Sequence, residues 1–269
     1  MLLATHGIVK NNTTAGYGAL TTAWIAATSE TDTTIISALN TLETDLTTYG
    51  LTSKMKALYP MVGGTAAKHK FNFMDSRDLD AAFRLTFNGG WTHSSTGALP
   101  NGTNAFADTF LKPSITLSQN NCGFSYYSRT NRAITASIGV YDASSYQFCL
   151  FPRLSTDTMI NRIATTVYAG DVYSGITDSR GFFTSSRNTS AYSKLFRNGT
   201  SLGNGAIAST GLPNYKFYIG ALSYENIYSQ YFDNEEFAFN AIHNGLTDTE
   251  AANLYTAVQN FNTTLSRQV

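Results

Sequence analysis

The chain has 269 residues, of which 42% are hydrophobic and 13% aromatic, so it carries enough apolar material for a large core. Charged residues make up 13% and the formal net charge is zero, so nothing attracts the chain electrostatically to nucleic acid or anionic lipid. No stretch approaches the roughly 18 apolar residues of a membrane helix, and the N-terminus lacks the basic and apolar regions of a secretory signal. We therefore expect neither a nucleic-acid partner nor membrane insertion.

Residues 1–17 are rich in Thr, Asn and Gly and are predicted to form an extended arm. Residues 32–49 are predicted to be helical, because Asp32 or Thr33 can cap the N-terminus and Gly50 suits a left-handed residue after the C-terminus. The apolar positions of this helix form a heptad-like stripe, namely Ile35, Leu39, Leu42, Leu46 and Tyr49. The stripe is too short for a free-standing coiled coil. It either seeds a homo-oligomer or packs on the chain's own β domain.

A second short helix is predicted over residues 53–59, because Pro60 would end it. The composition changes just after this point, and we place a domain boundary near residue 62. Residues 1–62 are then an attachment or oligomerisation segment made of an arm and short helices. Residues 63–269 are predicted to form the main β domain.

From His69 onward, hydrophobicity alternates with a period of two, which indicates strands with one buried and one polar face. The alternating residues are Phe71 and Phe73; Phe83, Leu85 and Phe87; Cys122, Phe124 and Tyr126; Ile134, Ala136, Ile138 and Val140; Phe217, Ile219 and Ala221; Phe237, Phe239 and Ala241. Asn198 and Gly199 fit a type I′ hairpin, because both tolerate a positive φ. Many short strands with regular turns predict a mainly β protein, an antiparallel β-sandwich of the jelly-roll type.

A closing helix is predicted over residues 247–262, since Thr247 and Glu250 form a capping box before an apolar face. We expect this helix to lie against the sandwich and to seal an edge or end of it. The two cysteines, Cys122 and Cys149, are either buried thiols in neighbouring strands or a disulfide.

The C-terminal third also resembles a known family. The hairpin KLFRNGT at 194–200, the strand YKFYIG at 215–220, and FAFNAI at 237–242 followed by GLTDTE resemble the closing part of laminin-G/concanavalin-like domains. The order and spacing match over residues 190–262, whereas residues 70–190 agree in strand pattern alone. The resemblance implies a concanavalin/laminin-G-like jelly roll. Because Ala238 and Asn240 occupy the strand where the family carries an acidic residue, no calcium site is carried over.

The ending of the chain and the segment FADTFL at 106–111 also resemble laminin-G-like proteins of tailed-phage virions. This resemblance implies a structural virion protein, a head fibre, decoration or tail adhesin component, assembled in the host cytoplasm and exposed on the particle. Other virion proteins would then bind the N-terminal segment. The alternative is a carbohydrate-binding adhesin of a phage or bacterial surface, extracellular, with a host surface glycan as its ligand.

The sequence carries none of the common catalytic signatures. The E-x-D-x-x-E strand motif of glucanases with this fold is absent, and Glu235 and Glu236 would point to opposite faces of a strand. The histidines show no metal-ligand spacing, and the acidic cluster of Asp75, Asp78 and Asp80 fits a solvated turn. We therefore expect no enzyme, no metal site and no cofactor.

Sugar binding commonly uses an exposed aromatic ring together with Asn or Asp side chains. The candidates for such a ligand site are Trp91, Tyr173, Tyr224, Asn226 and Tyr228. Each could instead be an ordinary packed side chain. The loop 224–231 is the strongest of these positions, because several tyrosines among polar residues are difficult to bury together.

Overall fold

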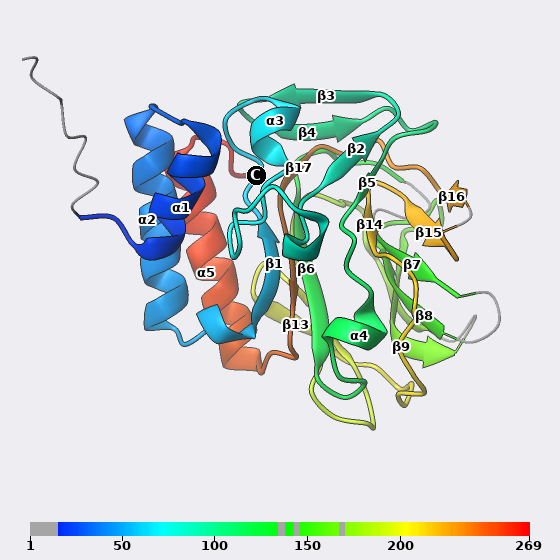
Figure 1. Cartoon of the computed structure of the whole chain (residues 1–269). Coiled ribbons are helices and arrows are strands. Elements are labelled where there is room, and N and C mark those ends of the chain that lie inside the picture. The colour runs from blue at the N-terminus through cyan, green and yellow to red at the C-terminus, as the bar shows by residue number, and fades with distance from the viewer. Residues whose placement is uncertain (1–15, 134–137, 143–145, 167–169, 227) are drawn as a thin grey trace, which may run out of the picture.

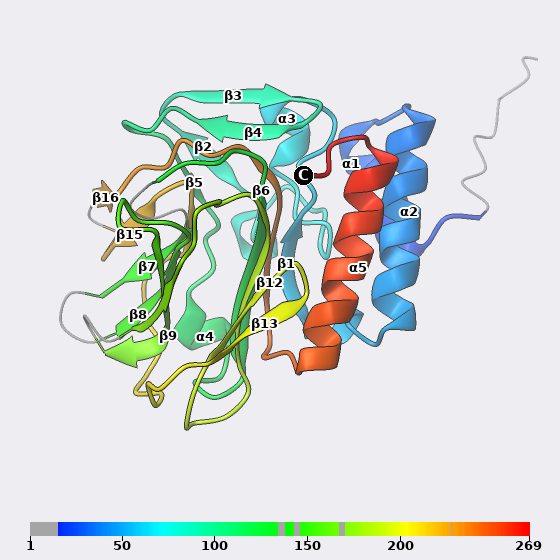
Figure 2. The ribbon, with the colours of Figure 1, turned by 180° about the vertical axis from the view of Figure 1, so that it is seen from behind.

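In a computed structural model, the structure describes residues 16–133, 138–142, 146–166, 170–226 and 228–269. They form two packed β-sheets with a layer of helices on one side, as Figure 1 and the reverse view in Figure 2 show. The predicted β-sandwich is therefore confirmed. Residues 1–15, which hold most of the predicted arm, and Ile134 and Ala136 of one predicted strand lie outside the described residues.

The sheet next to the helices is called the helix-side sheet. Its strands are β1 (Met55–Tyr59), β3 (Trp91–Ser94), β4 (Gly97–Pro100), β6 (Cys122–Ser128), β11 (Gly181–Arg187), β12 (Lys194–Arg197), β13 (Thr200–Asn204) and β17 (Phe237–His243). Their order is β13-β12-β11-β6-β17-β4-β3, and β1 also pairs with β17. The central strands β6, β11 and β17 are buried along their whole length, because the second sheet packs on one face and the helices on the other.

The second sheet is called the far sheet. Its strands are β2 (Thr86–Asn88), β5 (Phe106–Asp108), β7 (Ile138–Tyr141), β8 (Tyr146–Phe151), β9 (Thr158–Thr166), β10 (Asp171–Ser174), β14 (Tyr218–Ile219), β15 (Leu222–Tyr224) and β16 (Tyr228–Gln230). Most follow the order β10-β9-β8-β7-β14-β5-β2, with β15 between β7 and β16. The pairing of β15 with β7 is parallel, while the other pairs of this sheet are antiparallel.

Three long helices, α1 (Ala19–Thr28), α2 (Thr33–Thr48) and α5 (Asp248–Thr264), cover the outer face of the helix-side sheet (Figure 1, left). Short turns of helix complete the secondary structure: η1 (Thr52–Lys54), α3 (Ala66–His69), η2 (Asp80–Ala82) and α4 (Pro113–Thr116). Among the described residues, no helix has the length and apolar character needed to cross a membrane. The molecule is thus layered as helices, sheet and sheet.

Both long helices predicted from the sequence are present with the predicted caps. The Asp32 carboxylate accepts hydrogen bonds from the backbone N–H groups of Thr34 and Ile35 at the start of α2, and Gly50 has a φ of 69° after its end. The Thr247 capping box begins α5, and this helix covers a face of the sandwich instead of an edge or end. Helix α1 was not predicted.

The apolar stripe of α2 packs within the chain. Leu39, Leu42 and Leu46 are fully buried in the core between the helices and the helix-side sheet, and Ile35 and Tyr49 are partly buried against it. Of the two alternatives drawn from the sequence, packing on the chain's own β domain is the one observed. These residues are therefore not an exposed face for attachment to another protein.

The helix predicted over residues 53–59 is wrong, because this segment forms η1 and then β1. Strand β1 pairs antiparallel with β17, with Tyr59 opposite Asn240. It is apolar on both faces because Ala57 faces the core between the sheets and Leu58 faces the helices. A short apolar run of this kind has no periodicity that separates strand from helix. The boundary placed near residue 62 therefore does not divide two separate cores.

Other local predictions had mixed outcomes. Phe71 and Phe73 are buried, but they follow α3 in an irregular segment instead of a strand, because the Phe73 N–H bonds to the Leu58 carbonyl beside the sheet. The Asn198-Gly199 hairpin between β12 and β13 is confirmed, with φ values of 50° and 74°. The pattern of period two therefore identified buried positions more reliably than strands.

The two cysteines are free and buried. The prediction of two buried thiols is confirmed, but the expectation of neighbouring strands is wrong. Cys122 lies in β6 of the helix-side sheet, and Cys149 lies in β8 of the far sheet.

Candidate functional site

The outer face of the far sheet carries a cluster of aromatic side chains. In β8, alternation directs Phe148 and Leu150 into the core between the sheets, and it directs Cys149 and Phe151 to the opposite face. This outer cluster, called the tyrosine face, contains Tyr141, Cys149, Phe151 and Leu222, with Leu154, Ile160 and Tyr224 packed against it. It lies on the side of the molecule away from α1, α2 and α5 (Figure 1, right; Figure 2, left).

The strand register orders the tyrosine face into rows. One row runs across four strands and consists of Leu222, Gly139, Cys149 and Arg162. The next row consists of Tyr224, Tyr141 and Gln147. The rings of Tyr141 and Tyr224 lie 4.8 Å apart between centroids, so one end of the face is built from packed tyrosines.

The other end of the face is built around Phe151. The ring of Tyr231 meets that of Phe151 edge to face, with centroids 5.9 Å apart. Phe151 is 7% exposed, whereas Tyr231 is 46% exposed. Phe151 therefore supports the Tyr231 ring from the sheet, and Tyr231 presents its surface to solvent. Sequence reasoning identified the loop 224–231 but did not single out Tyr231, its last residue.

Arg162 lies at the same end of the face and was not predicted. Its guanidinium carbon sits 5.0 Å from the Phe151 ring centroid. Its Nε is buried without a hydrogen-bond acceptor, and no carboxylate of the described residues pairs with this side chain. Burial raises the pKa of the Cys149 thiol to about 12, although Arg162 contacts this thiol and acts in the opposite direction, so Cys149 stays neutral and supplies no negative charge to the arginine.

Trp91, the first predicted ligand residue, is a packed side chain on the other sheet. Its Nε1 donates to the Asn88 carbonyl at 3.0 Å, and its ring meets Phe87 with centroids 5.2 Å apart. Gly220 lies against it with a φ of 81°, and a Cβ there would come within 2.8 Å of the indole. The indole thus fills space between the sheets at their edge.

Tyr173 lines a hollow of about 230 Å³ beside β10, together with Asp171 and the segment 204–207. The Asp171 carboxylate already accepts hydrogen bonds from Ser193 Oγ at 2.8 Å and from the Ala206 N–H at 2.7 Å. The Tyr173 hydroxyl is buried without a partner, and burial followed by the Asp171 charge raises its pKa to about 12. The acidic group of this hollow is therefore used by the chain itself.

The remaining three predicted residues lie at one turn of the tyrosine face. Tyr224 packs on Tyr141 and is partly buried. Asn226 is exposed, and its Oδ1 accepts a hydrogen bond from the Lys216 N–H at 2.7 Å. Tyr228 is opposite Tyr224 in the β15–β16 pair, and its side chain lies outside the described part of the structure. The structure therefore brings Tyr224, Asn226 and Tyr228 together and places Trp91 and Tyr173 elsewhere.

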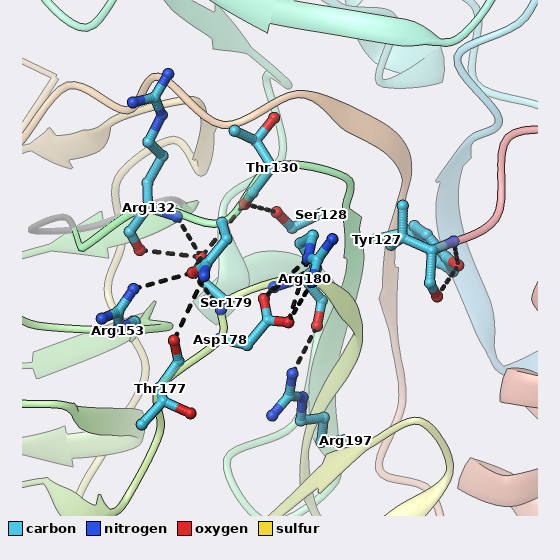
Figure 3. Close-up of polar contacts among 12 residues, drawn as sticks. Tyr127, Ser128, Thr130, Arg132, Arg153, Thr177, Asp178, Ser179, Arg180 and Arg197 are labelled. Atoms are coloured by element: carbon cyan, nitrogen blue, oxygen red, sulfur yellow. Dashed lines mark hydrogen bonds and ion pairs between the residues drawn. The ribbon is translucent and has the colours of Figure 1, made fainter.

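A polar cluster at the end of the sandwich, shown in Figure 3, serves the fold. The Ser179 hydroxyl donates to the Arg132 carbonyl at 2.9 Å and accepts from the Arg132 N–H at 2.8 Å, which ties the loops after β6 and before β11 together. Asp178 pairs with Arg180 at 2.9 Å beside them. Arg153 pairs with Asp157 next to this cluster, and Arg197 donates to the Arg180 carbonyl. These polar contacts tie neighbouring loops together.

The acidic residues before β17 have different surroundings. Glu235 is fully buried, and burial followed by the neighbouring Asp233 charge raises its pKa well above the ordinary value. Glu236 instead forms an ion pair with Arg129. In the described part of the chain, no three His, Cys, Asp or Glu side chains gather as metal ligands. The acidic cluster of Asp75, Asp78 and Asp80 forms ion pairs with Lys70, Arg77 and Arg84.

The sequence matches no protein-family model and no curated protein. Solved structures share its fold at low identity. One is domain 4 of AbnA, a GH43 extracellular arabinanase from Geobacillus stearothermophilus, in complex with arabinotriose. It is 14% identical, with a TM-score of 0.52, over 75% of this chain and 98% of that chain.

Two further structures are binding domains of toxins. The binding domain of botulinum neurotoxin serotype D is 11% identical, with a TM-score of 0.51, over 76% of this chain and 52% of that chain. The binding domain of Paraclostridial Mosquitocidal Protein 1 is 11% identical, with a TM-score of 0.50 and the same coverage. This chain thus spans about half the length of either toxin domain. These likenesses show the fold, a β-sandwich, while the expected virion location and virion partners stay predictions.

Proposed function

We propose that this chain is a non-catalytic carbohydrate-binding domain whose ligand lies on the tyrosine face. The observation that carries the proposal is the exposed ring of Tyr231, supported by Phe151 on a broad sheet face away from the helices. An exposed aromatic ring that packs edge to face against a neighbour still offers an apolar surface for the C–H face of a sugar, while its hydroxyl stays available to water or ligand. A rigid sheet beneath keeps this surface in place before a ligand arrives.

The layered fold supports this assignment. The helices bury their apolar faces on the other sheet and so do not cover the tyrosine face, where Tyr231 is the exposed ring. The arabinanase domain of similar fold was solved in complex with arabinotriose, which makes a sugar a reasonable ligand to test. This reading corresponds to the adhesin alternative of the sequence analysis.

The missing strand motif and the separate surroundings of Glu235 and Glu236 support a binding role without catalysis. Glycoside hydrolysis requires two carboxyl groups facing one bond at a defined separation. Glu235 is buried, and Glu236 is held by Arg129, so these two do not flank a common space. We therefore expect bound oligosaccharides to be recovered intact after long incubation, measured by chromatography. New, shorter products would contradict the non-catalytic part of the proposal.

The binding test compares the full chain with Tyr231→Ala on an array of neutral and acidic glycans, followed by titration calorimetry on the best ligand. Loss of a central aromatic contact is expected to weaken binding by about 10-fold or more. Tyr17→Ala is the matched control, because Tyr17 is 41% exposed at the start of the helical layer. Binding that survives Tyr231→Ala unchanged, or that Tyr17→Ala removes, would refute this site.

A further inference from the structure

We propose that the ligand of the tyrosine face is an acidic sugar and that Arg162 binds its carboxylate while Tyr231 stacks on its ring. This inference rests on the proposed function and names the chemical class of the ligand. Both groups contact the ring of Phe151, the guanidinium carbon at 5.0 Å and the Tyr231 ring at 5.9 Å from its centroid. They therefore lie close enough to meet one sugar unit or two linked units.

Most of the other arginines of the described structure have a polar partner within the chain. Several of these have a carboxylate partner, namely Arg77, Arg84, Arg129, Arg153 and Arg180. Arg187 and Arg267 are buried and donate to backbone carbonyls. Arg197 donates to the Arg180 carbonyl, although its Nε also lacks an acceptor. Arg162 has neither kind of partner among the described residues, and its buried Nε lacks an acceptor. An anionic ligand that meets the exposed part of the guanidinium would supply the counter-charge that the described residues do not.

The acidic residues near the face do not neutralise Arg162. Asp142 and Glu225 lie just after the ends of β7 and β15, and neither forms an ion pair with Arg162. Asp171, on the adjacent strand, is buried and bound to Ser193 and Ala206.

The chemistry of the group favours a carboxylate over a hydroxyl. A guanidinium presents its N–H donors in a planar fork that matches the two oxygens of a carboxylate. The contact with the Phe151 ring restrains the guanidinium, so less rotational freedom is lost when the anion binds. Uronic acids and sialic acids both carry such a group on a sugar ring, and the test separates these two sources.

The experiment uses pairs of ligands that differ by the acidic group. Galacturonan oligosaccharides are compared with neutral galactan oligosaccharides, and sialyllactose with lactose, by titration calorimetry on the full chain. We expect one acidic member to bind about 10- to 100-fold more tightly than its neutral parent. The preference is expected to shrink in high salt, because Arg162 is partly exposed.

The variants assign the preference to one side chain. Arg162→Met keeps the length and apolar packing on Phe151 and is expected to bind both members of each pair equally. Arg162→Lys keeps the charge without the fork and is expected to retain part of the preference. Arg77→Met, which removes an exposed and paired arginine, is the control and is expected to leave the preference unchanged.

The possible failures are distinguishable. If neutral sugars bind as tightly as acidic ones and Tyr231→Ala abolishes both, the proposed function stands and the acidic-sugar inference is wrong. A preference that persists in Arg162→Met also overturns the inference, provided that thermal unfolding shows the variant to be folded. If no glycan binds the folded full chain, both proposals are wrong.

Discussion

Arg267, near the C-terminus, allows a test of how the C-terminal end of the chain is held against the rest of the fold. The residue is fully buried, and its guanidinium donates to the carbonyls of Met61 at 2.7 Å, Pro60 at 2.6 Å and Ala238 at 2.8 Å, and to Asn262 Oδ1 at 2.7 Å. Burial lowers its pKa to about 9, so the group remains a cation at neutral pH. One charged side chain thus joins the segment after β1, the strand β17 and the end of α5.

Arg267→Met keeps similar volume but leaves three buried carbonyls without a donor. An unsatisfied buried acceptor costs about 1–3 kcal/mol, which gives about 3–9 kcal/mol for three carbonyls. Part of this cost is offset, because the variant no longer has to bury a guanidinium that has lost its hydration. We expect a net decrease of about 3–5 kcal/mol in the free energy of unfolding and a Tm lower by about 10 °C.

Urea unfolding at pH 7, followed by circular dichroism, measures this change. Arg77→Met is the control, because the Arg77 side chain is 66% exposed in an ion pair with Asp75, and a surface pair of this kind contributes little. If Arg267→Met unfolds within about 1 kcal/mol of the parent, the carbonyls have other partners. Arg267 would then not be what holds these three segments together.

Three further predictions follow from the helical layer and the core. Leu42→Ala is expected to lower the free energy of unfolding by about 2–5 kcal/mol without changing the sedimentation coefficient of the folded protein, because Leu42 is buried within the chain. Thr247→Ala is expected to cost about 1 kcal/mol in the same urea assay, through loss of the α5 cap. Burial lowers the pKa of His243 to about 4 and that of His69 to about 3. The unfolded chain therefore takes up protons below pH about 6.5 that the folded chain does not, and stability should fall with decreasing pH by about 1.4 kcal/mol per unit for each histidine. His243→Gln should flatten the slope of the urea midpoint between pH 7 and pH 5, and an unchanged slope would contradict this origin.

The fold class was predictable because local signals agreed along much of the chain. Caps at Asp32 and Thr247, the turn at Asn198-Gly199 and the alternation in β6 and β17 each act over a few residues. Such signals depend on backbone geometry that nearby side chains determine. They are therefore visible without knowledge of the rest of the molecule.

The errors arose where distant parts of the chain decide the structure. The segment 55–59 is a strand because β17, nearly two hundred residues later, offers it a hydrogen-bonding edge. The stripe of α2 has the spacing of a coiled-coil seam, but α5 and the helix-side sheet cover it. In both cases the apolar pattern correctly marks buried positions. The pattern cannot say whether the covering surface belongs to the same chain or to another.

The candidate site shows the same division between local and distant information. The tyrosines of the loop 224–231 were visible as aromatic residues among polar ones, and the structure places this loop on the tyrosine face. Arg162 lies in a strand without a recognisable sequence motif. Its role in the candidate site depends on its contacts with Cys149 and Phe151 in the neighbouring strand β8. An unpaired charge is a property of three-dimensional surroundings, since a sequence lists possible partners without showing which ones are used. The specificity that we assign to this face therefore depends on contacts that the three-dimensional structure shows and the sequence does not.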